Sequence, residues 1–208
     1  RTPLSTILLS TESLQANFSS LSDGQKQGNL ERIHLTAQQM SQQITDLLTL
    51  TRAEVGKLEF NPAMLDVTAF CRQMIDEMQP SIAQPVEFSS DQPGVKAFWD
   101  TKLMRSLLSN LLSNAAKYSP ATGPIQLHLS SNPHQATLEV RDCGMGIPPQ
   151  DQARILEAFQ RGSNAGDTPG TGLGLAIVKV CVELHQGHWH IDSKEGQGTT
   201  VSVTLPLE

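Results

Sequence analysis

The sequence predicts an α+β protein in which a helical hairpin precedes a two-layer sandwich of helices on a mixed, mostly antiparallel sheet. Two observations lead to this prediction. Apolar residues near the start of the chain recur at intervals of three and four, which is the spacing of one helix face. After residue 57, helical and strand-like segments mix without a regular strand–helix–strand repeat. We therefore place a domain boundary near Lys57, with a hairpin over residues 1–57 and a second domain over residues 58–208.

The hairpin consists of two helical segments. The first runs from Leu4 to about Phe18, and turn-forming residues in "SSLSDGQ" end it. In the second, apolar residues alternate three and four positions apart, as in coiled coils and four-helix bundles: Leu30, Ile33, Ala37, Met40, Ile44 and Leu47. Two helices alone bury little apolar surface, so we expect two copies of the hairpin to form a four-helix bundle. Packing of this apolar seam against the rest of the same chain is the alternative.

The second domain is expected to contain four helices and several strands. A strand-like "LEFNPAMLDV" leads into the helix "TAFCRQMIDEMQ", and "PVEFSS" is a further strand. The long helix "WDTKLMRSLLSNLLSNAAKYS" precedes a hairpin of "PIQLHLSS" and "ATLEVRD". A short helix "PQDQARILEAF", a glycine-rich loop, the helix "LGLAIVKVCVELHQ" and the closing strands "HWHIDS" and "TTVSVTLPL" complete the domain.

Composition excludes several classes of function. The chain has 15 Lys and Arg against 21 Asp and Glu, a net charge of −6 without long runs, so direct nucleic-acid binding is not expected. No apolar run approaches the roughly 20 residues that span a bilayer. Three cysteines, Cys71, Cys143 and Cys181, are far apart and form no C-x-x-C pair, so we expect neither a disulfide nor a zinc site. A soluble protein of the reducing cytoplasm is the simplest interpretation.

Three polar residues share one face of the long helix. At 3.6 residues per turn, Asn110, Asn114 and Lys117 fall within a wedge of roughly 60°. Asparagine competes for backbone hydrogen bonds and is a mediocre helix former, so propensity does not explain two of them here. This face is therefore a candidate ligand-binding face.

Two glycine-containing segments are candidate binding loops. Asp142, Gly144 and Gly146 form a D-x-G-x-G pattern after a strand, where a carboxylate can accept a hydrogen bond from an exocyclic amine such as that of adenine. Taken alone, a D-x-G pair is more often a simple turn. Gly170, Gly172 and Gly174 precede an apolar helix whose N-terminus can bind phosphate. The spacing matches neither a dinucleotide-binding fingerprint nor a P-loop.

The order of these motifs resembles the catalytic and ATP-binding domain of sensor histidine kinases, in the ATPase superfamily that also holds gyrase, MutL and the Hsp-type chaperones. The resemblance covers about residues 58–208. It implies that Asn114 ligates Mg²⁺ on the nucleotide, with Asn110 in support. It also implies that Lys117 reaches a phosphate, that Tyr118 lies against adenine and that Asp142 accepts a hydrogen bond from the adenine amine.

The same resemblance assigns further residues to the nucleotide site. Phe159 and Arg161 match the F-x-R box of the family, in which the arginine neutralises γ-phosphate charge. Residues 160–170 would be the mobile ATP lid, and Leu175 follows its last glycine. "EGQGTT" matches the terminal G-x-G-T element, so Thr199 is expected to contact adenine through water. Val201 stands where the family often has Phe, and this difference affects only the expected local packing.

The first 57 residues resemble the dimerisation and histidine-phosphotransfer hairpin of the same family. The family motif is H-E-L/I-R-T-P-L and this chain begins "RTPL", so the phosphoacceptor would stand three residues before Arg1 and is absent here. Thr2 matches a threonine that orients water for phosphatase action in some members, and Pro3 matches the proline that bends the helix. We interpret all six histidines present as structural or solvated: His34, His128, His134, His185, His188 and His190.

The resemblance implies an ATP-dependent histidine kinase core that transfers the γ-phosphoryl group to a histidine and then to an aspartate of a response-regulator receiver domain. Expected cofactors are ATP and Mg²⁺, and the expected assembly is a homodimer through the hairpin. Membrane attachment would come only from segments upstream of Arg1. Alternatives are an ATP hydrolase or serine kinase of the same superfamily and a nucleotide-binding scaffold without kinase activity. Against hydrolysis, Asn110 stands where the hydrolases have a general-base glutamate.

Overall fold

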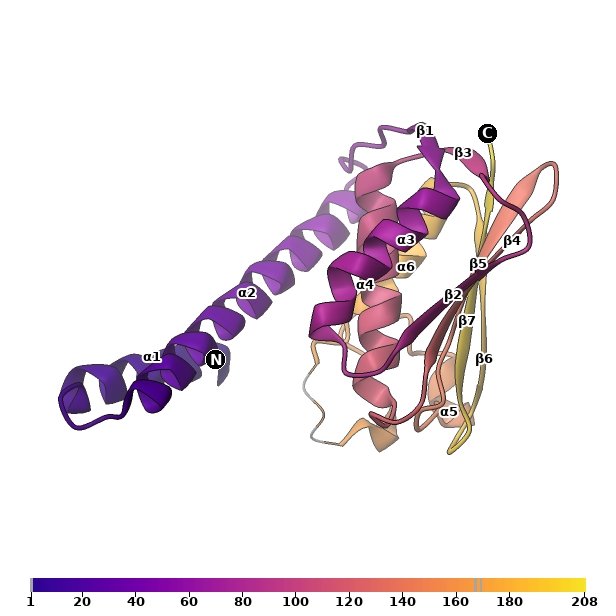
Figure 1. Cartoon of the computed structure of the whole chain (residues 1–208). Coiled ribbons are helices and arrows are strands. Elements are labelled where there is room, and N and C mark those ends of the chain that lie inside the picture. Colours follow the sequence, from indigo (N-terminus) through magenta and orange to yellow (C-terminus); the bar gives the residue numbers. More distant parts are fainter. Residues whose placement is uncertain (1, 167, 169) are drawn as a thin grey trace. The chain divides into compact units, whose positions relative to one another are not determined.

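The computed structural model describes residues 2–166, 168 and 170–208, without the side chains of residues 2 and 39 (Figure 1). It divides into two compact units, Arg1–Thr49 and Leu50–Glu208. The helix α2 continues from the first unit into the second, and Leu50 belongs to the core of the second. We keep Lys57 as the proposed boundary between the two functional domains.

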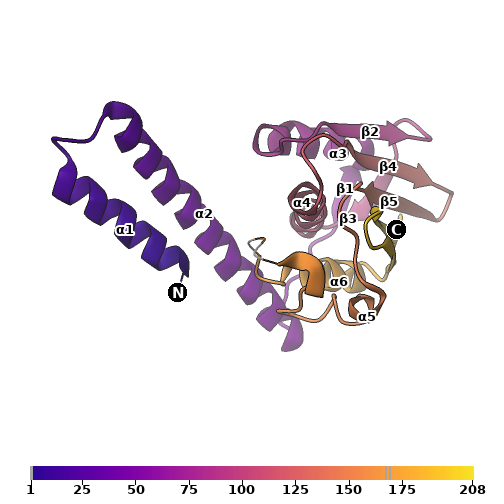
Figure 2. The ribbon, with the colours of Figure 1, turned by 90° about the horizontal axis from the view of Figure 1, so that it is seen from below.

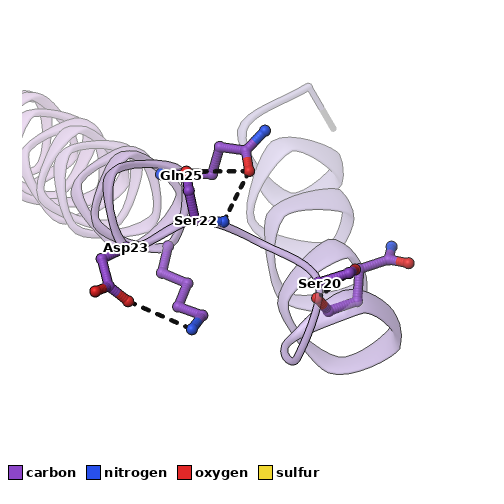
Figure 3. A network of polar contacts seen from close by, with 6 residues as sticks. Ser20, Ser22, Asp23 and Gln25 are labelled. Carbon is purple, nitrogen blue, oxygen red and sulfur yellow. Dashed lines mark hydrogen bonds and ion pairs between the residues drawn. The ribbon is translucent and has the colours of Figure 1, made fainter.

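The first unit is the predicted hairpin of two helices, α1 (Thr2–Asn17) and α2 (Asp23–Glu54). A capping box starts α2: the Gln25 amide N donates to Ser22 Oγ at 3.3 Å, and the Ser22 amide N donates to Gln25 Oε1 at 2.9 Å (Figure 3). Asp23 adds negative charge to the first turn, where the helix dipole favours it. The turn therefore fixes where the second helix begins.

Apolar residues of the predicted seam are exposed in the single chain. Leu30, Ile44 and Leu47 are 54%, 57% and 45% exposed. On α1, Leu4, Leu8 and Leu9 are also exposed. An apolar stripe of this length on a hairpin requires a partner surface to become buried.

The second unit is a two-layer α+β sandwich, which confirms the predicted fold class. Its five-stranded sheet consists of β2 (Val86–Ser90), β4 (Ile125–Ser131), β5 (Gln135–Arg141), β6 (His188–Lys194) and β7 (Gly198–Pro206). The strand order is β2-β4-β5-β7-β6, in which β2 and β4 are parallel and all other pairs are antiparallel. The helices α3 (Val67–Met78), α4 (Thr101–Tyr118) and α6 (Gly174–Leu184) lie on one face of this sheet (Figures 1 and 2).

A two-stranded antiparallel pair, β1 (Ala63–Asp66) and β3 (Lys96–Trp99), forms a second sheet, and short helices complete the unit: η1 (Gln79–Ser81), α5 (Pro149–Gln152) and η2 (Ser163–Ala165). The sequence analysis missed β3 and assigned Trp99 to the long helix. The structure places Asp100 as the N-cap of α4, where its Oδ1 accepts from the amides of Lys102 and Leu103 at 2.9 and 3.1 Å. Because the N-cap residue Asp100 is extended, the helix begins only at Thr101 and does not include Trp99.

Two other predicted elements are shorter than expected. The strand predicted from residue 58 forms only at β1. The helix predicted to reach Phe159 ends at Gln152, and Phe159 has φ 66°, which lies in the left-handed region. A right-handed helix cannot include a residue in that conformation, and turns connect Gln152 to Phe159.

The core lies between the sheet and the three helices. Along β4 and β5, buried residues alternate with partly or fully exposed ones, so that one face of each strand supplies apolar side chains. The helix α4 buries seven residues against this face: Leu103, Met104, Leu107, Leu108, Leu111, Leu112 and Ala115. This burial fixes the rotation of α4 about its axis, and it leaves Asn110, Asn114 and Lys117 half-buried at the edge of the apolar stripe.

The end of α6 matches the predicted helix C-cap, with a difference in which residue turns the chain. Gln186 takes the left-handed conformation at φ 55°, and the Gly187 amide N donates to the Val182 carbonyl at 2.9 Å. Gly187 is needed for space instead, because a Cβ there would overlap Thr204 O and Leu205 Cδ2.

His185, just before this turn, is buried and structural. Its Nδ1 donates to Cys181 O at 2.7 Å and its Nε2 accepts from the Asp100 amide at 3.0 Å, which joins the N-cap of α4 to the end of α6. Both ring nitrogens are therefore used in holding the two helices together.

Candidate nucleotide-binding site

The asparagine face of α4 lies against the first turn of α6. A Cβ placed on Gly174 would lie 2.8 Å from Asn110 Oδ1 and 3.4 Å from Asn114 Nδ2. A larger residue at position 174 would therefore require the Asn110 side chain to move. The Asn110 Nδ2 donates to Ser106 O at 2.9 Å, so the Asn110 side chain is held by its own helix.

The end of the same helix places two further predicted residues beside the glycine-rich loop. Lys117 Nζ lies 4.7 Å from the centre of the Tyr118 ring. A Cβ on Gly170 would overlap Lys117 Nζ and lie 3.6 Å from the Tyr118 hydroxyl. The loop backbone thus runs directly over this cation and this ring.

Asp142, at the end of β5, is a partly buried carboxylate with donors around it. Its Oδ1 accepts from the amides of Gly144 and Thr199 at 2.7 and 3.3 Å. Burial raises the pKa of Asp142, and these two amides and the Ser119 side chain act in the opposite direction by favouring the ionised form. A carboxylate offers about four acceptor positions, so Asp142 can accept from a further donor.

The D-x-G-x-G loop is clamped on both sides by close backbone contacts. A Cβ on Gly144 would lie 2.8 Å from the Tyr118 carbonyl carbon, and one on Gly146 would overlap the Lys194 carbonyl. The amide N of Met145 donates to Tyr118 O at 3.1 Å, and Met145 O accepts from the Gly196 amide at 2.7 Å. The loop therefore has the end of α4 on one side and the β6–β7 turn on the other.

Thr199 is held beside this loop. Its Oγ1 lies 2.8 Å from Ser193 Oγ, while Ser193 Oγ also accepts from the Ile147 amide at 2.8 Å. Ser193 was not identified from the sequence, since a single serine in a strand carries no distinguishing signal.

The segment predicted as a lid is closed at its base by the Phe159 amide N, which donates to Gly172 O at 3.0 Å. The Phe159 side chain is 66% exposed. Arg161 turns toward the lid backbone, where its Nη2 donates to Gly166 O at 3.2 Å and to Thr168 O at 2.5 Å. Asn164, also missed from the sequence, donates through Nδ2 to Gly146 O at 3.0 Å and ties the lid to the D-x-G-x-G loop.

The predicted site residues of the second domain therefore meet around one region, which joins the asparagine face and C-terminal end of α4, the D-x-G-x-G loop, Thr199 and the start of α6. Leu175 lies half-buried in the first turn of α6. Thr2 belongs to the hairpin, and its side chain lies outside what the structure describes.

The start of α6 differs from the starts of the other two sheet-covering helices. Asp66 and Asp100 cap α3 and α4 through side-chain hydrogen bonds. Within the described residues, the N-cap of α6, Leu173, makes no side-chain cap hydrogen bond. An uncapped helix start leaves amide donors and a partial positive charge for an anion such as phosphate.

Comparison with known protein families agrees with this geometry. Residues 99–208, more than half of the chain, match the family described as histidine kinase-, DNA gyrase B- and HSP90-like ATPase. Residues 1–56 match the His kinase A (phospho-acceptor) domain. The chain belongs to the sensor histidine kinase family. The predicted resemblance is confirmed for both parts of the chain.

Individual histidine kinases align over most or all of the chain. The circadian input-output histidine kinase CikA of Synechococcus elongatus is 32% identical over 99% of this chain, which spans 28% of the length of CikA. The structure of the mycobacterial sensor histidine kinase MprB is 31% identical, with a TM-score of 0.63 over 69% of this chain and 97% of the MprB chain. Full-length ShkA in complex with AMPPNP has the same fold, with a TM-score of 0.74 at 24% identity over 98% of this chain and 46% of that chain.

The side chains of this candidate site would suit a nucleotide with a divalent ion. Among the described residues, no group of three His, Cys, Asp or Glu side chains could hold a metal, so an ion here would depend on the Asn114 amide and on ligand oxygens. Arg161 Nε is buried and has no hydrogen-bond partner among the described residues, so it is an unsatisfied donor, which an anion would reach only if the surrounding lid moved. In the described part of the chain, no helix combines the length and apolar character needed to cross a membrane.

Proposed function

We propose that this chain is a histidine kinase core that binds Mg²⁺–ATP between α4, the D-x-G-x-G loop and the start of α6. The observation that carries this proposal is the uncapped start of α6, which lies against Asn110 and Asn114. Asp142 stands at the other end of the same region, beyond the Tyr118 backbone. A bound nucleotide would place its triphosphate at the start of α6 and its base at the Asp142 carboxylate.

Each residue has a distinct proposed role in binding. Asp142 accepts a hydrogen bond from the exocyclic amine of adenine, and Thr199 supports it through a bridging water. Asn114 ligates Mg²⁺ through its amide oxygen, with Asn110 in support, and Lys117 contacts a phosphate. The ion would supply neutralisation of phosphate charge during transfer.

Arg161 links nucleotide binding to the lid. In the structure its Nη2 donates hydrogen bonds to the carbonyl oxygens of Gly166 and Thr168. To reach a γ-phosphate, the guanidinium has to exchange these carbonyls for phosphate oxygens, and the lid has to rearrange. We propose that Phe159, Arg161 and the glycines at positions 170, 172 and 174 act together in this closure.

The hairpin is proposed to form a homodimer and to present the phosphoacceptor. The exposed seam residues Leu30, Ile44 and Leu47 would bury against a second copy in a four-helix bundle. The γ-phosphoryl group would pass to a histidine of the hairpin and then to an aspartate of a response-regulator receiver domain. Thr2, on the first turn of α1, is proposed to orient water in phosphatase action.

Hydrolysis by a general base on α4 is less consistent with the site. Asn110 stands where the hydrolases of the superfamily carry their glutamate, and an amide does not accept a proton at neutral pH. The Asn110 amide is also bonded to its own helix. Transfer to a histidine therefore remains the function that the site supports best.

Calorimetry with Mg²⁺ and a non-hydrolysable ATP analogue tests the binding proposal. Asn114→Ala should weaken Mg²⁺-dependent binding by about tenfold or more, and Asp142→Asn should reduce the preference for adenine over guanine nucleotides. Gln126→Ala, at an exposed position on the sheet, is the matched control and should bind as the wild type does. Unchanged affinity and selectivity in both site variants would refute the site.

Labelling with γ-labelled ATP tests the transfer step. The chain is incubated alone and with a hairpin in which His-Glu-Leu precedes the "RTPL" sequence. We expect acid-labile, base-stable label on the added hairpin and none on the chain alone. Rapid phosphate release without label on the hairpin would favour an ATP hydrolase, and binding without either reaction would favour a scaffold.

A further inference from the structure

The C-terminal end of α4 is held by a glutamine from a distant segment. Gln84 lies between η1 and β2 and is only 3% exposed. Its Nε2 lies 2.9 Å from Ala116 O, 3.1 Å from Ser119 O and 3.4 Å from Pro120 O. Three carbonyl oxygens surround this atom, so it must be the amide nitrogen that faces them.

This side chain replaces the usual means of ending a helix. The last carbonyls of a helix have no partner within it, and a glycine after the last turn commonly satisfies them. The residue after α4 is instead Ser119, which is extended at φ −103° and ψ 150°. Gln84 satisfies Ala116 O and Ser119 O, and the Met145 amide satisfies Tyr118 O at 3.1 Å.

Gln84 is itself fixed by a second glutamine. The Gln79 Nε2 donates to Gln84 O at 2.9 Å, and Gln79 Oε1 accepts from the Val86 amide at 3.0 Å. A loop held in this way has little freedom to move its side chain. The donor that faces the end of α4 is therefore preorganised.

The capped turn carries the residues that contact the nucleotide in the proposed function. Lys117 and Tyr118 form the last positions of α4, and the Tyr118 carbonyl bonds to the loop that follows Asp142. If the carbonyls lost their donor, they would turn toward water, and this turn would no longer hold one conformation. Lys117, Tyr118 and the D-x-G-x-G loop would move with it.

We propose that Gln84 is a positioning residue of the nucleotide site: through its hydrogen bonds to the end of α4, it holds Lys117 and Tyr118 in the conformation that binds nucleotide. This inference rests on the proposed binding of Mg²⁺–ATP at that site. Gln84 contacts no ligand itself in this proposal. Gln84 instead raises the fraction of molecules in which the end of α4 has the nucleotide-binding conformation.

Two substitutions separate the donor from the volume of the side chain. Gln84→Met keeps the length without the donor, and Mg²⁺–ADP affinity measured by calorimetry on the whole chain should fall about tenfold, since apparent affinity scales with the competent fraction. Gln84→Glu presents a carboxylate to three carbonyls and should bind more weakly still at about pH 8. Its affinity should recover as the pH falls, because a protonated carboxyl regains an O–H donor, whereas the wild type should show no such recovery.

A spectroscopic readout distinguishes positioning from general stability. Tyr118 is the single tyrosine of the chain, so protein labelled with 3-fluorotyrosine gives one ¹⁹F resonance from the end of α4. In Gln84→Met this resonance should shift or broaden before nucleotide is added. Leu129→Ala, a fully buried change on β4, is the control: it should lower the melting temperature but leave the resonance and the affinity unchanged.

The outcomes separate this inference from the proposed function. If Gln84→Met and Gln84→Glu bind Mg²⁺–ADP within about twofold of the wild type and keep its ¹⁹F resonance, Gln84 is only structural and the inference is wrong. If the wild type does not bind nucleotide at all, the proposed function fails, and with it the positioning role that rests on it. The inference would also be wrong if Gln84→Met and Leu129→Ala lowered the melting temperature equally and weakened nucleotide binding equally, because the loss of affinity would then follow from lower stability.

Discussion

Replacing Gly144 by alanine should separate the D-x-G-x-G loop from the end of α4. A Cβ at this position would lie 2.8 Å from the Tyr118 carbonyl carbon and 2.8 Å from Asp142 Oδ1, and it would overlap Tyr118 O. The Tyr118 atoms belong to the backbone of a packed helix end, so the loop has to move by several tenths of an ångström or more. Such a movement stretches the hydrogen bond from Met145 N to Tyr118 O, now 3.1 Å.

The expected cost follows from these contacts. Overpacking against a rigid neighbour costs about 1–3 kcal/mol, and one lost backbone hydrogen bond adds about 1 kcal/mol. The free energy of unfolding should therefore fall by about 2–4 kcal/mol. For a domain of this size, the melting temperature should drop by about 5–15 °C.

The same movement displaces Asp142, whose Oδ1 accepts from the Gly144 amide at 2.7 Å. Nucleotide affinity should fall by about 100-fold, as expected when a hydrogen bond to a charged group and its geometry are both lost. Thermal denaturation followed by circular dichroism measures the first effect, and calorimetry with Mg²⁺–ADP at a temperature where the variant is folded measures the second.

Gly94→Ala is the matched control. Gly94 has φ 67°, and no described heavy atom lies within 4 Å of a Cβ placed there, so alanine costs about 1–2 kcal/mol of backbone strain without touching the site. This variant should melt earlier than the wild type and bind nucleotide normally. If Gly144→Ala melts within about 1 °C of the wild type, or binds as well as Gly94→Ala, the close approach of the loop to α4 does not hold.

Three further predictions concern other parts of the chain. Burial lowers the pKa of His185, so below about pH 6.5 the unfolded chain binds more protons than the folded chain does. Denaturant titrations should therefore show the free energy of unfolding falling from about pH 7 to pH 5. His185→Gln should lessen this dependence on pH, and an unaltered dependence would show that another group causes it. Asp151 Oδ2 accepts from Ser163 N and Oγ, both at 2.7 Å, which lowers the Asp151 pKa, so this contact should persist until the pH falls below the usual carboxyl value. Asp151→Asn should therefore speed hydrogen exchange in residues 160–166 without changing the melting temperature. Equal exchange rates would show that the Asp151–Ser163 contact does not hold the lid in place. Gly28→Ala, inside α2 with no described heavy atom within 4 Å, should stabilise the hairpin by about 0.5–1 kcal/mol, whereas destabilisation would indicate that Gly28 packs against a second chain.

Most elements of the fold follow from the periodicity of the sequence. The strands β4 to β7 and the helices α3, α4 and α6 have clear apolar patterns, and the structure confirms them within a few residues. The strand β3 was missed because Trp99 also continues the apolar pattern of α4. What ends the helix there is the side chain of Asp100, which also accepts from the Asn61 amide at 2.8 Å, a contact made between distant segments.

The residues of the candidate site were predictable because short motifs contain them. Asn110 and Asn114 share a helix face, and D-x-G-x-G and G-x-G-x-G are local patterns. Ser193, Asn164 and Gln84 have no such pattern, since each acts through a backbone group far away in the sequence. Sequence analysis therefore identifies the groups proposed to contact a ligand more readily than the groups that hold them in place.

The most direct test of this account is a crystal structure of the chain with Mg²⁺ and a non-hydrolysable ATP analogue. We expect the exocyclic amine of adenine within hydrogen-bond distance of the Asp142 carboxylate, and an ion ligated by the Asn114 amide oxygen beside the first turn of α6. An adenine ring remote from Asp142, or phosphates that approach neither Asn114 nor the start of α6, would contradict the account.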